Sequence, residues 1–148
     1  MKKIILIAVF FFSIIPSAFL FAQSEFENFS NGEIICSDNG QFMEGTFRTS
    51  NLPYDNMIIG VIQKSHANKT AASPSSGGFS LKQDGVCDVK YNSENGAIKK
   101  GDILTSSSSQ GEAMKATKSG TIIGVALEDA SSPSGLLKIR VMIQYVKQ

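Results

Sequence analysis

The chain contains two short motifs that each occur twice, in the same order. Residues 32–37 (GEIICS) are similar to residues 101–106 (GDILTS), and residues 58–61 (IIGV) are identical to residues 122–125. The offset between the copies is 69 residues for the first motif and 64 for the second, and a loop that differs in length explains this, because loops tolerate insertions and deletions. Such a pattern predicts a duplicated β-unit. The two copies would cover about residues 32–91 and 101–146.

The first 22 residues have the layout of a secretory signal. Lys2 and Lys3 precede an apolar run that continues to Ala22, where a small residue suits cleavage. The alternative is an uncleaved anchor, because residues 4–22 come close to the ~20 apolar residues that span a bilayer. Pro16 interrupts the run and argues against the anchor. We expect a signal helix in residues 1–22, cleavage after Ala22, and a protein that is secreted, periplasmic or at the cell surface.

The mature chain, residues 23–148, has the size of a single domain with its own core. Removal of residues 1–22 takes away two of the 14 Lys and Arg residues and none of the 13 acidic residues, which leaves 12 basic against 13 acidic residues. A protein that binds nucleic acid needs clustered Lys and Arg to neutralise phosphates, and the basic residues here are scattered. The sequence therefore predicts no nucleic-acid partner.

Alternating apolar and polar residues predict strands in much of the mature chain. In the last strand, Leu137, Ile139, Val141, Ile143 and Tyr145 alternate with more polar residues and are expected to face the core. Inward-facing positions are predicted in two more strands, at Cys87, Val89 and Tyr91 and at Ile123, Val125 and Leu127. Asn-Gly, Asp-Gly and Ser-Gly pairs mark turns between the strands. The sequence thus predicts an all-β fold, a duplicated small barrel or sandwich that follows the signal helix.

Cys36 and Cys87 are the two cysteines of the chain. An exported protein meets oxidising conditions, in which the pair could form a disulfide that closes a loop of about 50 residues and contributes about 4 kcal/mol in the chain-entropy model. The alternative is a pair of buried free thiols that pack as small apolar side chains. Both alternatives stay open, because the sequence does not show whether the two Cα atoms lie close enough for a bond.

Residues 64–78 interrupt the strand pattern with a segment rich in Ser, Ala, Asn and Thr. Long loops of this kind are either functional or plain connections. As a candidate binding loop, the segment offers Lys64, His66, Asn68 and Lys69. His66 is the one histidine, and no neighbouring carboxylate would hold it as a catalytic base. We expect no catalytic site, no metal site and no cofactor.

The repeated motifs contain two acids and four glycines at matching positions. Glu33 and Asp102 could be symmetric partners in a two-carboxylate site. We favour the alternative that each acid, which follows a turn glycine, caps backbone amides or faces water. The glycines are expected to be structural, and Gly60 and Gly124 should lie where a side chain is not tolerated, through positive φ or close packing. The glycines of the repeat are Gly32, Gly60, Gly101 and Gly124.

Three segments of the chain resemble one known domain family. They are residues 85–91 (GVCDVKY), 94–107 (ENGAIKKGDILTSS) and 111–117 (GEAMKAT). With residues 122–128 and the last strand, they resemble the C-terminal β domain of phage tail and preneck-appendage proteins and bacterial surface proteins, the intramolecular-chaperone autoproteolytic domain family. The resemblance covers about residues 32–146. It implies a mostly β domain that often works as a trimer in a fibre and that, in some members, cleaves itself to release a folding chaperone.

The chain departs from the self-cleaving members, because only residues 24–27 (SEFE) stand for their acidic lead-in segment. We expect an exported, non-enzymatic β domain, a homo-oligomer that mediates self-association or surface attachment, with a cell-surface or glycan partner. Two alternatives stay open. One is a self-processing peptidase that uses Glu25 or Glu27, and the other is a carbohydrate- or small-ligand-binding module that uses residues 64–78.

Overall fold

The computed structural model describes residues 28–38, 47–64 and 78–147. The predicted signal segment lies outside these ranges, as do the residues of the predicted binding loop between Lys64 and Gly78. Within the three ranges all regular secondary structure is β-strand, which confirms the predicted all-β fold. In this part of the chain, no helix has the length and apolar character of a membrane span.

The described residues form nine strands. In chain order they are β1 (Ile34–Ser37), β2 (Phe47–Thr49), β3 (Ile58–Lys64), β4 (Phe79–Lys82), β5 (Asp84–Asn92), β6 (Ile103–Ser106), β7 (Ala113–Lys115), β8 (Gly120–Ala126) and β9 (Ser134–Val146).

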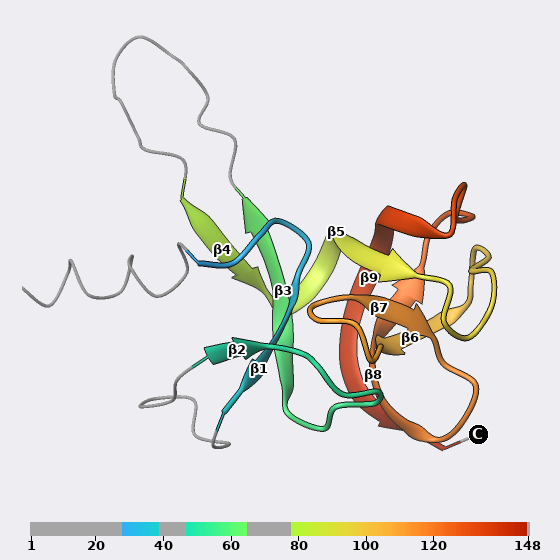
Figure 1. Cartoon of the computed structure of the whole chain (residues 1–148), viewed down its shortest axis with the longest axis horizontal. Coiled ribbons are helices and arrows are strands. Elements are labelled where there is room, and N and C mark those ends of the chain that lie inside the picture. Colours follow the sequence, from blue (N-terminus) through green and yellow to red (C-terminus); the bar gives the residue numbers. More distant parts are fainter. Residues whose placement is uncertain (1–27, 39–46, 65–77, 148) are drawn as a thin grey trace, which may run out of the picture.

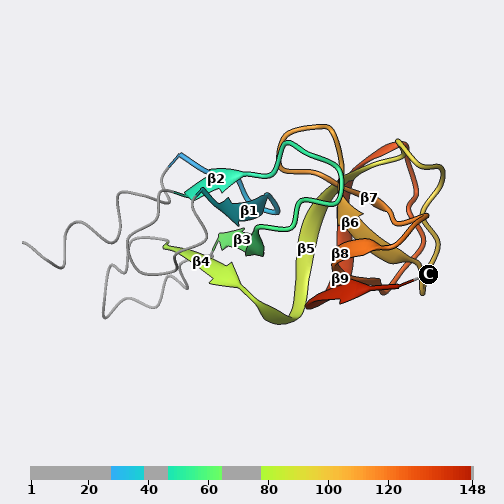
Figure 2. The ribbon, with the colours of Figure 1, turned by 90° about the horizontal axis from the view of Figure 1, so that it is seen from below.

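The strands form an open sheet and a closed barrel that lie side by side (Figure 1, Figure 2). The open sheet has the order β2-β1-β3-β4 and is antiparallel. The barrel has the order β5-β7-β6-β8-β9. It closes because β5 pairs with β9 over its whole length and with β7, in parallel, at Tyr91 and Ala113. Only Gln83 separates β4 from β5, so the chain passes directly from the edge of the sheet into the barrel.

The strand order of the open sheet matches that of β7-β6-β8-β9 in the barrel, and the strands pair in the same register. The repeated motifs lie on these strands, the first on β1 and β6 and the second on β3 and β8. The matching pairs are Ile34↔Val61 with Ile103↔Val125, Ile35↔Gly60 with Leu104↔Gly124, and Ile62↔Leu81 with Ala126↔Ile139. Among the described strands, β5 is the barrel strand without a counterpart in the open sheet.

The strands of the open sheet contribute to two separate cores. Ile34 and Cys36 in β1 join the main core, which also contains the barrel interior, whereas Ile35 between them faces the other side of the sheet. This alternation follows from the pleat of a strand, in which successive side chains point to opposite faces. The open sheet therefore packs one face against the barrel and directs the other face away from it.

The predicted alternation in β5 and β9 is confirmed for most positions. The buried side chains, each at most 5% exposed, are Cys87, Val89, Tyr91, Leu137, Ile139 and Val141. Ile143 is half-buried and packs against the main core, as predicted, whereas the prediction was wrong at Tyr145, which is 71% exposed. Past Met142, its last pair with β5, β9 pairs with β8 alone up to Val146, so its final residues have no β5 neighbour.

The predicted alternation in β8 was wrong after Ile123. Val125 and Leu127 are half-buried, and Ala126 between them is buried instead. The register with β9 shifts between Ile122 and Gly124. An irregularity of this kind changes the count of residues along one strand, and a shift of one residue moves the following side chains to the opposite face.

Candidate binding site at the open sheet

The site is built on two turns with the same backbone hydrogen bonds, one before β1 and one before β6. Gly32 and Gly101 have φ values of 83° and 89°, in the left-handed region that favours glycine. Their amides donate to the carbonyls of Ile62 at 2.7 Å and Ala126 at 2.8 Å. The two turns therefore place β1 against β3 and β6 against β8 in the same way.

The acids that follow these glycines cap the turns. Glu33 accepts a hydrogen bond from the Ser30 amide at 2.9 Å, and Asp102 accepts one from the Lys99 amide at 2.8 Å. A carboxylate that accepts an amide three residues earlier in the chain satisfies a donor that the turn would otherwise leave open. This is the capping role that the sequence favours, and each carboxylate is held in its own turn.

Each capping carboxylate also pairs with a lysine of a barrel strand. Lys90 Nζ lies 2.8 Å from Glu33 Oε1, and Lys115 Nζ lies 2.9 Å from Asp102 Oδ2. Partial burial raises the pKa of Asp102, but the hydrogen bonds from Lys115 and from the Lys99 amide outweigh it, so its pKa lies below the ordinary value. The pair of Lys90 and Glu33 joins β5 to the first turn of the open sheet and so helps to fix the two bodies against each other.

Gly60 and Gly124 lie where the neighbouring strand comes too close for a side chain. A Cβ atom at Gly60 would lie 2.6 Å from the carbonyl oxygen of Lys82 in β4, and one at Gly124 would overlap the carbonyl oxygen of Arg140 in β9. Lys82 and Arg140 hold matching places, since each pairs with the valine that follows the glycine. Close approach of the backbone, and not positive φ, therefore requires glycine at both positions.

A small apolar cluster, which we call the outer core, covers the face of the open sheet that does not join the main core. Its buried members are Ile35, Ile59 and Ile62. Its half-buried members are Phe29, Phe47, Phe79 and Leu81.

Every member of the outer core has a counterpart in the main core, at the matching position of the second unit. The pairs are Ile35 with Leu104, Ile59 with Ile123, Ile62 with Ala126, Phe29 with Ile98, Phe47 with Ala113, Phe79 with Leu137, and Leu81 with Ile139. The seven counterparts are at most 2% exposed. This difference in burial comes from β5, whose Cys87, Val89 and Tyr91 are buried in the main core beside the counterparts. No described strand brings a similar row of side chains to the outer core.

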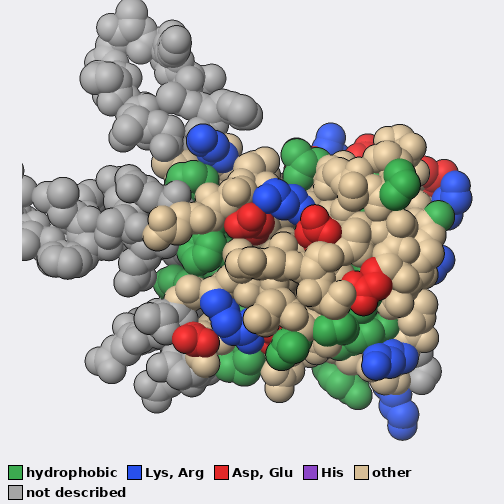
Figure 3. Space-filling model, viewed as in Figure 1, with side chains coloured by type: hydrophobic (Ala, Val, Ile, Leu, Met, Phe, Trp, Pro, Cys, Tyr) green, Lys and Arg blue, Asp and Glu red, His purple; other side chains and the backbone are tan. Residues whose placement is uncertain are grey.

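β4 forms one edge of the open sheet. It pairs with β3 from Phe79 to Lys82 on one side, and with no described strand on the other. Phe79 and Leu81 are half-buried in the outer core, whereas Ser80 and Lys82 are exposed. In Figure 1, β4 lies at the outer side of the sheet, and the same side of Figure 3 shows green hydrophobic surface beside blue Lys or Arg side chains. The edge thus combines an apolar row with positive charge.

The predicted binding loop contributes one described residue near this edge at its start. Lys64 ends β3, its amide donates to Asn31 Oδ1 at 2.7 Å, and its Nζ lies 5.6 Å from the centre of the Phe79 ring. That distance is typical of a cation–π contact. The predicted residues outside the described ranges are Glu25, Glu27, His66, Asn68 and Lys69.

Cys36 and Cys87 are free thiols, and both are buried in the main core. The disulfide that the sequence allows is therefore not formed, and the alternative of two buried thiols describes the structure. Burial, together with the carboxylate of Asp55, raises the pKa of Cys36 to about 12. Burial and the charge of Asp88 raise the pKa of Cys87 to about 11. Thiols that ionise so poorly are inert as nucleophiles and as metal ligands.

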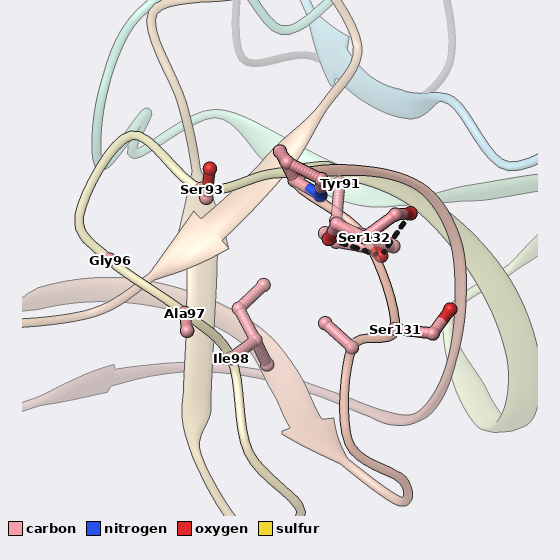
Figure 4. A pocket seen from close by; sticks show the side chains of 9 residues that line it. Tyr91, Ser93, Gly96, Ala97, Ile98, Ser131 and Ser132 are labelled. Carbon is pink, nitrogen blue, oxygen red and sulfur yellow. Dashed lines mark hydrogen bonds between the residues drawn. The ribbon is translucent and has the colours of Figure 1, made fainter.

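The barrel has a pocket of about 410 Å³ at one end (Figure 4). Its lining residues are Tyr91, Ser93, Gly96, Ala97, Ile98, Ala130, Ser131, Ser132 and Pro133. The hydroxyl of Tyr91, which is the main polar group of the pocket, already donates a hydrogen bond to the carbonyl of Ser132 at 2.9 Å. The lining has no charged side chain to orient a ligand, and we assign none to it.

The sequence does not single out β4, although it carries a signal. Phe79, Ser80, Leu81 and Lys82 alternate between apolar and polar. Four residues are a short stretch for such a pattern, and these border the polar segment that the sequence assigns to a loop. Which strand lies at an edge depends on strand order, and a sequence pattern does not give that order.

Within the described ranges, no group of three or more His, Cys, Asp or Glu side chains is arranged to hold a metal ion. Comparison of the whole chain with family models, curated proteins and solved structures gives no match.

Proposed function

We propose that this chain is an exported, non-enzymatic β domain that mediates self-association or surface attachment, similar to the end domains of tail fibres. The observation that carries the proposal is the open sheet, which lies beside a barrel of matching strand order and ends in an apolar edge at β4. An exposed sheet edge presents backbone donors and acceptors that pair readily with another chain. The resemblance to fibre-end domains favours a trimer.

The side chains that could suggest catalysis have structural partners. Glu33 and Asp102 cap turns and bind lysines, and the two thiols are buried with raised pKa values. These contacts support a scaffold role for the groups that the sequence offers as reactive. The matching registers of the open sheet and the barrel also support our inference that the chain contains two copies of one β-unit. The first copy ends with β4 at Lys82 and not at residue 91, because β5 belongs to the barrel.

The test is the absolute mass of residues 23–148 in solution, measured by light scattering over a range of concentrations, together with sedimentation of the protein with the cells that export it. We expect either a defined oligomer, with a trimer as the form that the resemblance favours, or saturable attachment to the cells. Intact mass followed over days should show one stable species.

A monomer that does not attach to cells would contradict the proposal. So would time-dependent self-cleavage, or turnover of a hydrolase substrate that Asp102→Asn abolishes without unfolding the protein. Self-cleavage would favour the peptidase alternative instead.

A further inference from the structure

We propose that the edge of β4 that faces no described strand accepts an extended strand from another protein, in the place that β5 takes in the barrel. This inference rests on the proposed function and names the partner of the same surface. The partner strand would run antiparallel to β4 and cover the outer core. Addition of a strand to a sheet edge is an established mode of peptide recognition, in which the backbone gives affinity and alternate side chains give specificity.

The barrel shows what fills this place. The β9 segment that matches β4 pairs with β5 on its far side, at Val86↔Arg140, Cys87↔Ile139, Asp88↔Lys138 and Val89↔Leu137. At the matching positions of β4, from Lys82 back to Phe79, the far side faces no described strand. The consequence is visible in burial, because Leu137 and Ile139 are at most 2% exposed whereas Phe79 and Leu81 are only half-buried. A strand on that edge would bury them as β5 buries their counterparts.

The template also defines the chemistry of the partner strand. β5 directs Cys87, Val89 and Tyr91 inward and leaves Asp88 and Lys90 between them more exposed. The outer core has Ile62 and Phe47 where the barrel interior has the smaller Ala126 and Ala113. Its remaining space is therefore smaller, and we expect the partner to bring small or medium apolar side chains at alternate positions.

Charge at the edge adds a second requirement. Lys82 is exposed at one end of β4, and Lys64 lies over Phe79 at the other end. In the barrel, Asp88 of β5 pairs across the strands with Lys138 of β9 on the outer face. Opposite charges on neighbouring strands stabilise a pair and like charges oppose it. The partner strand should therefore carry Asp or Glu at its outward positions.

The mature chain does not supply this strand from the position that β5 occupies. β5 covers residues 84–92, and the 69-residue offset of the repeated motif places its counterpart at residues 15–23. The predicted cleavage after Ala22 would remove that segment. No described strand of this chain lies on the far side of β4, and we therefore place the covering strand in another molecule.

The test uses residues 23–148 and a fluorescent peptide based on β5, residues 84–92. The peptide carries Cys87→Ala and Tyr91→Val at inward positions, and Val86→Glu and Lys90→Glu at outward positions, so that it fits both requirements. Fluorescence anisotropy should show saturable binding of this peptide and none of a scrambled peptide. Leu81→Lys places a charge in the outer core and should weaken binding by about tenfold or more, whereas Ser80→Lys adds the same charge on the outward face and should change it by less than about twofold. Melting temperatures of both variants check that the fold is kept.

Hydrogen exchange on the unaltered chain gives a readout that needs no variant. Peptide binding should slow the exchange of outward-facing amides in Phe79–Lys82, and leave β9 unchanged. Binding that is equal in both lysine variants, or no binding at all, would overturn the inference. A dimer that Leu81→Lys dissociates would also overturn it, because the occupant would then be a second copy of this chain. If the peptide does not bind while the protein still forms its oligomer or attaches to cells, only the inference that β4 accepts a strand is wrong, and the proposed function still holds.

Discussion

Gly124 shows how one absent side chain sets the distance between two strands. Its place in β8 lies directly against the carbonyl of Arg140, and a methyl group there would overlap that oxygen. We predict that Gly124→Ala lowers the free energy of unfolding by about 2 kcal/mol or more, because overpacking forces the β8–β9 pair apart. Urea denaturation monitored by circular dichroism measures this loss.

Gly78→Ala is the matched control for that substitution. A methyl group at Gly78 would have no neighbouring atom within 4 Å, and the residue does not adopt positive φ. The same change there should alter the free energy of unfolding by less than about 0.5 kcal/mol. Equal losses at the two positions would show that close approach at Gly124 is not the reason for its glycine.

Asp102 should make stability depend on pH in the acidic range. Its pKa is lowered in the folded chain despite partial burial, because Lys115 and the Lys99 amide stabilise the carboxylate. The stabilisation is therefore complete above the unfolded pKa of about 4 and is lost as pH falls through the lower folded pKa. We predict that Asp102→Asn flattens the pH dependence of unfolding below about pH 4. An unchanged slope in urea titrations across that range would contradict the role of the carboxylate.

The two cysteines should behave as unreactive thiols in the folded protein. Both are buried, with pKa values of about 12 for Cys36 and about 11 for Cys87. We predict that a thiol reagent at pH 8 modifies neither residue in buffer and modifies both in denaturant without reductant. Detection of no free thiol after denaturation would mean that the protein forms the disulfide.

Between elements, Tyr54 ties the β2–β3 connection to the turn before β8. Its hydroxyl accepts hydrogen bonds from the amides of Thr117 at 2.7 Å and Lys118 at 3.2 Å. We predict that Tyr54→Phe costs about 1 kcal/mol of unfolding free energy and speeds the exchange of these two amides. Tyr145→Phe is the control, because that ring is 71% exposed and its loss of a hydroxyl should leave stability unchanged. Equal effects of the two substitutions would rule out the tether.

The elements also show what the sequence can predict. The alternation of β5 and most of β9 follows from the sequence because both strands line the barrel wall without interruption. The alternation of β8 does not, because the shift between Ile122 and Gly124 depends on how β9 fits against it. The glycine positions follow from the repeat, but the carbonyls that require them lie on strands far along the chain. The binding edge at β4 is missed for the same reason, since strand order decides which strand lies outermost.

For the molecule as a whole, the contrast between its two bodies is the basis of the functional account. The barrel completes a four-stranded unit with β5, and the open sheet carries the same arrangement without a described fifth strand. The chain passes from β4 to β5 across a single residue, so the strand that closes the barrel also continues from the edge of the sheet. We infer that this design joins a stable barrel to a sheet that stays available for a partner.

Native-state hydrogen exchange of residues 23–148, measured at a concentration at which the protein is monomeric, tests that account most directly. The exchange rates to compare are those of the amides of Phe79–Lys82 in β4 and of the matching residues 137–140 in β9. Strand β9 pairs with β5 on one side and with β8 on the other. We predict protection of all four amides in the β9 segment, and of only those amides in β4 that point toward β3. Uniform protection of the β4 amides in the monomer would contradict the account, because the edge would then already be covered.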